Sequence, residues 1–197
     1  HGWWSEVEAS NGLSKALAYT ANFGDWDSCE QGPALCLGEL SIFGVSQGFF
    51  DGDGKASLAV SYDGVDAGYD SSWMGRGYNL VSFLPISLDV LSTGTFDMYD
   101  AESGASAAML AFMQEMPVGA VLVVLGADAI DYSDSSLPNL SPDVATYLTV
   151  NFGAMDVSLL GYQDSYALVS TKGSSTPLAE TASTAGEGQA SVAATGV

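Results

Sequence analysis

The regular part of the hydrophobic pattern begins near Ala34, where apolar runs start to alternate with turns rich in glycine and aspartate. The run over residues 35–46, LCLGELSIFGVS, predicts a strand that leads into the turn at Asp51–Gly54. Apolar and polar positions alternate over 56–62, which predicts the return strand of a hairpin. Further short strands are expected over residues 75–85 and 94–98.

Two later segments have the pattern of helices. Residues 101–116 are rich in alanine, place methionines and a phenylalanine at helical spacing, and end at Pro117. We interpret those methionines as core residues. Ser141-Pro142-Asp143 supplies an N-cap, a proline at the first helical position and an acid in the first turn, which predicts a helix toward Phe152.

Strands are expected beside these helices, over residues 121–125 and 166–170. The first is a continuous β-branched and apolar run, which is typical of a strand buried on both faces. The order of elements predicts an α+β fold, in the form of a compact sandwich of two antiparallel β-sheets flanked by short helices.

Composition divides the chain into three parts. Residues 1–33 mix tryptophan, tyrosine and phenylalanine with glycine, asparagine and aspartate, and predict an aromatic, mostly irregular N-terminal arm. Residues 34–173 form the main domain. Residues 174–197 are rich in Ser, Thr, Ala and Gly, and this composition predicts a disordered C-terminal tail.

Charge restricts the possible partners. The chain has 24 acidic residues against four lysines and arginines, a formal net charge of −20. Binding to nucleic acid needs clustered cations, so nucleic acid is excluded, and anionic membranes are disfavoured for the same reason. The longest apolar run, residues 118–126, is shorter than the roughly 20 residues of a membrane-spanning helix.

Cys29 and Cys36 are the two cysteines of the chain. Their spacing is too long for a CxxC redox pair, and they lack the additional ligands of a zinc site. A small disulfide-closed loop is our interpretation, with two free thiols as the alternative. A disulfide and the start at His1 both favour a processed, exported protein.

Four ordered motifs resemble a known family. They are the segments 32–37 (GPALCL), 76–79 (RGYN), 96–99 (FDMY) and 162–166 (YQDSY), the last of which continues to the Lys-Gly pair at 172–173. In order and spacing, residues 34–173 resemble the interleukin-like EMT inducer and PANDER proteins. The resemblance implies a secreted, non-catalytic domain with two antiparallel sheets and flanking helices.

The resemblance also implies a binding site. Similar domains occur beside catalytic domains in a glycosyltransferase, where the domain binds sugar, and in hyaluronan-processing surface proteins. In the sugar-binding relative, an acid after the strand matching 121–125 and an arginine before an Asp-Ser/Thr-aromatic motif hold the glycan. The acid corresponds to Asp128, the arginine is replaced by Gln163, and the motif begins at Asp164. These three are the candidate ligand-binding residues.

No catalytic residues, metal site or cofactor are predicted. His1 is the single histidine, so a Ser-His-Asp or Cys-His arrangement would depend on the first residue of the chain. The segment from Asp51 begins like a calcium loop, but Ala56 and Tyr62 stand where an EF-hand needs Gly and Glu. Arg76 is expected to bind a nearby carboxylate and fix the entry to a strand.

The sequence therefore favours a non-catalytic interaction domain or accessory structural subunit of a larger extracytoplasmic assembly. The protein would be secreted or lie in an organelle lumen, such as that of the thylakoid. Its partners would be protein subunits contacted through the N-terminal arm and the C-terminal tail. The alternatives are a carbohydrate-binding module that uses Asp128, Gln163 and Asp164, then a secreted signalling ligand, and last an enzyme.

Overall fold

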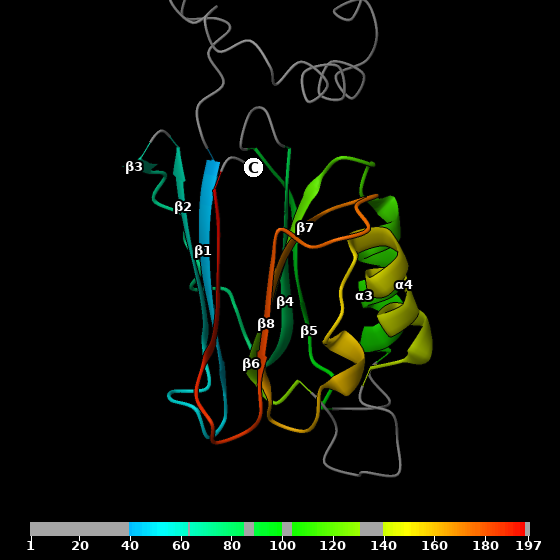
Figure 1. Cartoon of the computed structure of the whole chain (residues 1–197). Coiled ribbons are helices and arrows are strands. Elements are labelled where there is room, and N and C mark those ends of the chain that lie inside the picture. The colour runs from blue at the N-terminus through cyan, green and yellow to red at the C-terminus, as the bar shows by residue number, and fades with distance from the viewer. Residues whose placement is uncertain (1–39, 63, 85–88, 100–103, 131–139, 196–197) are drawn as a thin grey trace, which may run out of the picture.

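The computed structural model describes residues 40–62, 64–84, 89–99, 104–130 and 140–195. The cysteines Cys29 and Cys36, and the whole N-terminal arm, lie outside these ranges. Within them, strands dominate and two α-helices are inserted among the later strands (Figure 1). The elements are β1 (Leu40–Gly48), β2 (Ala56–Tyr62), β3 (Val65–Asp66), β4 (Gly77–Phe83), β5 (Val90–Phe96), α3 (Ala105–Glu115), β6 (Val121–Asp128), α4 (Pro142–Phe152), the 3-10 helix η2 (Val157–Leu159), β7 (Ser165–Thr171), β8 (Ala179–Ser183) and β9 (Ala190–Thr195).

The strands lie in two layers that are joined at one point. The outer layer has the order β3-β2-β1-β9, and the inner layer has the order β5-β4-β6-β7-β8. A short parallel pairing of Gln47 with Ala127 and of Gly48 with Asp128 links β1 to β6. The predicted α+β class is confirmed. Through this link, however, the described strands form one mixed network rather than two separate antiparallel sheets.

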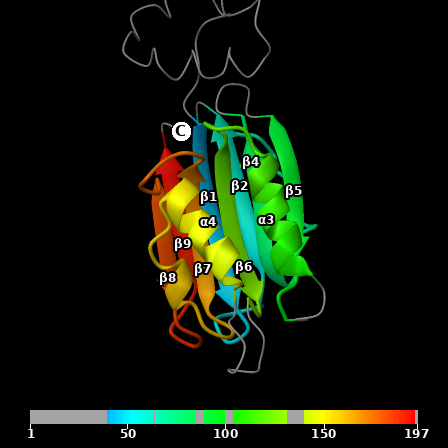
Figure 2. The same ribbon diagram turned by 90° about the vertical axis from the view of Figure 1, so that its right-hand side faces the viewer.

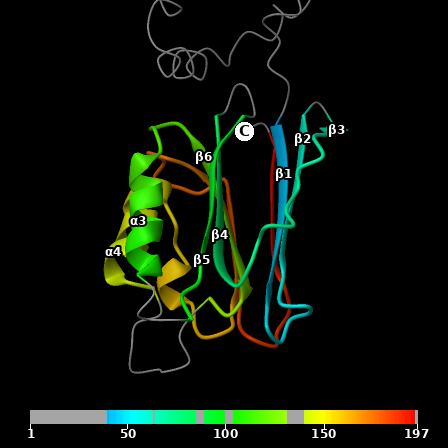
Figure 3. The same ribbon diagram turned by 180° about the vertical axis from the view of Figure 1, so that it is seen from behind.

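The helices cover only the inner layer. Both α3 and α4 lie on the side of β4, β6 and β7 that faces away from β1 and β2 (Figures 2 and 3). One hydrophobic core fills the space between the inner layer and the helices, and a second core fills the space between the two layers. As a result, every residue of β4 is buried, and so is every residue of β6 before Asp128.

Both predicted helices are confirmed. In α3, Met109 and Met113 are fully buried and Met116 is nearly so, as expected of core methionines. At the start of α4 the Ser141 hydroxyl accepts a hydrogen bond from the Val144 N–H, and Gly153 ends the helix in the left-handed conformation. This is the N-cap and glycine stop that the local sequence favours.

The prediction of a disordered C-terminal tail is wrong. Strand β8 pairs with β7, and β9 pairs with β1 from Ser41 to Ser46. The tail contains few large apolar residues, yet it forms strands because its backbone pairs with β7 and β1 and because Ala190, Val192 and Ala194 are buried between the layers. Small side chains and complete backbone pairing thus stabilise a segment that composition alone would leave unfolded.

Candidate functional site

The three predicted ligand residues meet at one end of the inner layer. Asp128 is the last residue of β6, and Gln163 and Asp164 directly precede β7. Because β6 and β7 pair antiparallel, the end of the first strand lies beside the start of the second. We call this region the loop end: it comprises the β1–β2 turn at 49–55, Asp128, the turn at 161–164 and the β8–β9 turn at 184–189.

The backbone of the loop end is tightly packed. The Phe49 N–H donates to the Asp128 carbonyl at 2.9 Å, continuing the parallel link between β1 and β6. A Cβ added to Gly48 would lie 2.0 Å from the Gln163 carbonyl oxygen, so only glycine fits there. Asp128 and Gln163 both adopt positive φ, at 59° and 65°, which is uncommon for residues with side chains. Close backbone contacts hold these two residues in place: Gly48 lies against the Gln163 carbonyl, and the Phe49 N–H binds the Asp128 carbonyl.

Asp164 is a structural residue in this arrangement. One of its carboxylate oxygens accepts the Gly161 N–H at 2.6 Å, and the other accepts the Ala185 N–H at 2.9 Å. The side chain thereby closes its own turn and fastens it to the β8–β9 turn. Gln163 is also inward, with 8% of its surface exposed. Asp128 and Asp164 are both partly exposed, and because backbone N–H groups occupy the Asp164 carboxylate, Asp128 is the better candidate to bind a ligand.

Asp51 organises the loop end, whereas the sequence predicts only a hairpin turn at this residue. That turn is confirmed, since β1 and β2 pair antiparallel on either side of it. One Asp51 oxygen accepts the Ser165 hydroxyl at 2.9 Å, and the other accepts the N–H groups of Gly186 and Gly188. The Ser165 hydroxyl in turn accepts the Gly48 N–H. One carboxylate thus ties three turns together.

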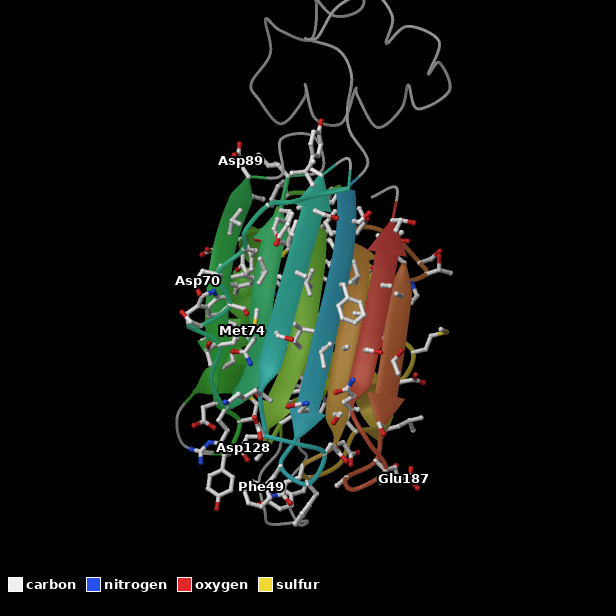
Figure 4. All side chains as sticks on the ribbon, turned by 90° about the vertical axis from the view of Figure 1, so that its left-hand side faces the viewer. Phe49, Asp70, Met74, Asp89, Asp128 and Glu187 are labelled. Carbon is white, nitrogen blue, oxygen red and sulfur yellow. The ribbon has the colours of Figure 1, made fainter. Side chains whose placement is uncertain are left out.

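Two aromatic residues of the loop end, Phe49 and Phe50, are not among the predicted site residues. They are 54% and 65% exposed, and their rings pack edge to face with centroids 5.2 Å apart. Consecutive phenylalanines after a strand usually indicate more core. The signal that could have identified them is the adjacent Asp-Gly-Asp-Gly, because a turn directly after an apolar pair leaves little chain to bury it. Phe49, Asp128 and Glu187 lie at the same end of the molecule in Figure 4.

Arg76 provides the positive charge near Asp128. Its guanidinium binds both carboxylate oxygens of Asp97, with the shortest contact at 2.6 Å, and lies 4.4 Å above the centre of the Tyr99 ring. The predicted tie between Arg76 and a carboxylate is confirmed. The hydrogen bonds to Asp97 raise the pKa of Arg76, and the charge of Asp128 adds to this effect.

The described part of the chain lacks two kinds of feature. It contains no helix that is long and apolar enough to cross a membrane. It also contains no group of three or more His, Cys, Asp or Glu side chains arranged to hold a metal ion. The loop end is therefore a surface of exposed rings beside several partly or fully exposed carboxylates, among them Asp53, Asp128 and Glu187, supported by a network of carboxylate-to-backbone hydrogen bonds.

Comparison with known proteins gives the family. No curated protein matches the chain. A family model described as interleukin-like EMT inducer matches residues 76–174, half of the chain, and this range includes β4 to β7 with both helices. The match agrees with the resemblance carried by the sequence motifs. The chain therefore belongs to the interleukin-like EMT inducer family.

Proposed function

We propose that this chain is a non-catalytic binding module that serves as an accessory subunit of a larger extracytoplasmic assembly, with the loop end as its contact surface. The observation that carries the proposal is the exposed pair Phe49 and Phe50. Two neighbouring phenylalanines lose little conformational entropy on binding and offer a large apolar area. Residues of this kind are enriched where proteins meet.

The support beneath the pair strengthens the proposal. The Asp51 carboxylate ties the β1–β2 turn to Ser165 and to the β8–β9 turn, and the Phe49 N–H binds the Asp128 carbonyl. A partner would therefore meet a preformed surface, and little of the binding free energy would go into ordering loops. This favours recognition by a fixed shape.

The place where this chain contacts its partner subunits differs from the one that the sequence predicts. The C-terminal tail was expected to bind neighbours, but pairing of β8 with β7 and of β9 with β1 accounts for its order within one chain. The N-terminal arm lies outside the described residues. We therefore assign the contact to the loop end. The family membership and the lone His1 favour a role without catalysis.

The test is copurification from the natural source with the full chain. Replacing both Phe49 and Phe50 by serine should strongly reduce the recovery of specific partner proteins, measured by quantitative mass spectrometry. The control is Val118→Ser, because Val118 is 61% exposed and precedes β6, at the end opposite Asp128. Equal recovery with the double variant and with the control would contradict the proposal.

A second candidate function is carbohydrate binding at Asp128. The observation that favours it is the adjacency of the partly exposed Asp128 and the exposed Phe49, whose N–H donates a hydrogen bond to the Asp128 carbonyl. A carboxylate can accept hydroxyl groups of a sugar while a ring covers its apolar face. We expect Asp128→Asn to abolish a glycan-array signal without unfolding the protein. No signal from the unchanged protein, or an equal signal from the variant, would exclude this site.

A further inference from the structure

The exposed face formed by β1, β2 and β9 is free of charged residues, whereas β3 at the edge of the outer layer carries the exposed Asp66. Strands β1, β2 and β9 contain no Asp, Glu, Lys, Arg or His, although the chain as a whole has 24 acidic residues. Figure 4 views this face directly, with β2, β1 and β9 across it. The outward positions alternate with buried ones along each strand, as expected for a sheet that is covered on one side only.

The outward residues form a regular pattern around one large side chain. Phe43 is 51% exposed at the middle of β1, and the strand register places Ala59 on one side of it and Ala193 on the other. The rows above and below contain only small or β-branched residues. These rows are Ser61, Ser41 and Thr195, and Ser57, Val45 and Ser191. The face is thus a single ring set among short side chains.

Acidic residues lie at the margin of this face. In Figure 4, Asp89 and Asp70 lie along one side of the three strands, and Asp128 and Glu187 lie at their lower end. A charged partner surface would have to lose its hydration against the uncharged centre, at a cost that no opposite charge on the face offsets. The centre therefore fits an uncharged surface of similar relief.

We propose that this face binds the same face of a second copy of the chain. A two-fold axis makes such a contact self-complementary, because each Phe43 can lie over the alanine rows that flank the partner's Phe43. Short side chains on both surfaces allow the two sheets to approach to the usual spacing of about 10 Å. Elsewhere on a protein of charge −20, contact between copies brings like charges together.

The proposed contact is weak and has a distinctive dependence on salt. Three strands about 4.8 Å apart and some six residues long at about 3.3 Å each give a footprint of roughly 300 Å² per copy. This is well below the roughly 800 Å² per partner of a standard stable interface. Because the contact contains no charges while the two bodies repel, adding salt should strengthen dimerisation. An interface built on ion pairs would weaken instead.

Sedimentation equilibrium of the full chain, over a wide range of protein and NaCl concentrations, tests the proposal. We expect a monomer–dimer equilibrium that shifts toward dimer as salt is added. A protein that stays monomeric under all these conditions overturns the proposal, whether the face is simply exposed or is covered by other residues of the same chain. A dimer that dissociates as salt is added also overturns it.

Two substitutions at Ala193 distinguish two effects on dimerisation: the burial of a new charge in the contact, and the change in the net charge of the chain. Ala193→Asp and Ala193→Lys should each weaken dimerisation about tenfold or more, since the new charge appears twice in the contact. Val150 provides the matched controls, because it is 69% exposed on α4, across the molecule from the outer layer. Val150→Lys should strengthen dimerisation slightly, and Val150→Asp should weaken it slightly.

The outcomes of these variants are distinct. If Ala193→Lys strengthens dimerisation as Val150→Lys does, only net charge matters and the proposed face is wrong. The double serine variant at Phe49 and Phe50 should dimerise normally, because the loop end lies outside the proposed contact. The proposed dimer contact at this face and the proposed partner contact at the loop end can therefore be disproved independently of each other.

Discussion

The inner and outer layers use the same strand geometry in opposite ways. In the inner layer, every residue of β4 is buried, because the outer layer covers one face and the helices cover the other. In the outer layer, the residues of β9 alternate between buried and exposed. The inner layer is therefore the structural centre of the protein, and the uncovered surface of the outer layer remains available for contact.

The layers also differ in where their polar groups lie. In the inner layer, Lys172 is 8% exposed and its ammonium donates to three backbone carbonyls at the end of α3. The buried Tyr166 hydroxyl donates to Glu180. In the outer layer the serines and threonines point mostly to solvent. Substitutions in the inner layer should consequently cost more, and the predictions below test this difference.

The largest contrast is expected between two phenylalanines. Phe152→Ala removes a ring that is fully buried between α4 and the inner layer, and should lower the free energy of unfolding by about 3–5 kcal/mol. Phe43→Ala removes a half-exposed ring from the outer face and should cost less than about 1 kcal/mol. Urea unfolding of both variants measures the difference. Equal losses would show that the outer face is as strongly packed as the helix side.

A contrast of similar kind is expected between two lysines. Lys172→Met leaves the carbonyls of Met113, Gln114 and Met116 without their donor, which should cost about 2–3 kcal/mol. Lys55 has a side chain that is 75% exposed and lies 3.8 Å from Asp53. Lys55→Met should therefore change stability by less than about 0.5 kcal/mol. The same urea titration compares them, and a small loss for Lys172→Met would mean that water replaces its bonds.

A smaller effect tests whether β9 belongs to the folded unit. Val192 is 3% exposed in the core between the layers, and Val192→Ala should cost about 1–2 kcal/mol. Ser191→Ala, at the neighbouring outward position, should be nearly neutral. Thermal unfolding gives both values. Hydrogen exchange adds a second measure, since the β9 amides that bind β1 should be protected; rapid exchange would separate β9 from the fold.

Much of the inner layer could be predicted from the sequence because its local signals agree with its packing. The run over β6 is continuous and apolar as burial on both faces requires, and the Ser141 cap and Gly153 stop bound α4. Strand β9 could not be predicted, because its residues are small or polar apart from Val192, although Ala190 and Ala194 are buried. Composition records their small size and polarity, while the pairing partner that stabilises them, β1, lies far away in sequence.

The candidate site was predictable in position but not in chemistry. Motif spacing placed Asp128, Gln163 and Asp164 together, and they meet at the loop end. Whether a ligand can reach them depends on backbone groups that no motif specifies. The Ala185 N–H donates to the Asp164 carboxylate, and the Gly48 backbone lies directly against the Gln163 carbonyl. The three turns that Asp51 joins are distant in sequence, so its role appears only in the folded chain.

The smallest expected effect at neutral pH concerns Tyr166, and it becomes large in alkali. Its hydroxyl donates to Glu180, whose carboxylate also accepts the N–H groups of Met155 and Asp156. Tyr166→Phe keeps the buried ring and those two backbone bonds. It removes one hydrogen bond, which should cost about 0.5–1.5 kcal/mol near pH 7.

The alkaline effect follows from the pKa of Tyr166. Burial, with the nearby charge of Glu180, raises the pKa of Tyr166 well above its usual value. The unfolded chain releases this proton near pH 10 whereas the folded chain retains it, so the stability linked to this proton is complete below about pH 10 and is lost as pH rises further. The unchanged protein should lose about 1.4 kcal/mol per pH unit more than Tyr166→Phe in that range. Urea titrations at increasing pH measure both slopes, and equal slopes would show that Tyr166 ionises in the folded protein as readily as in the unfolded chain.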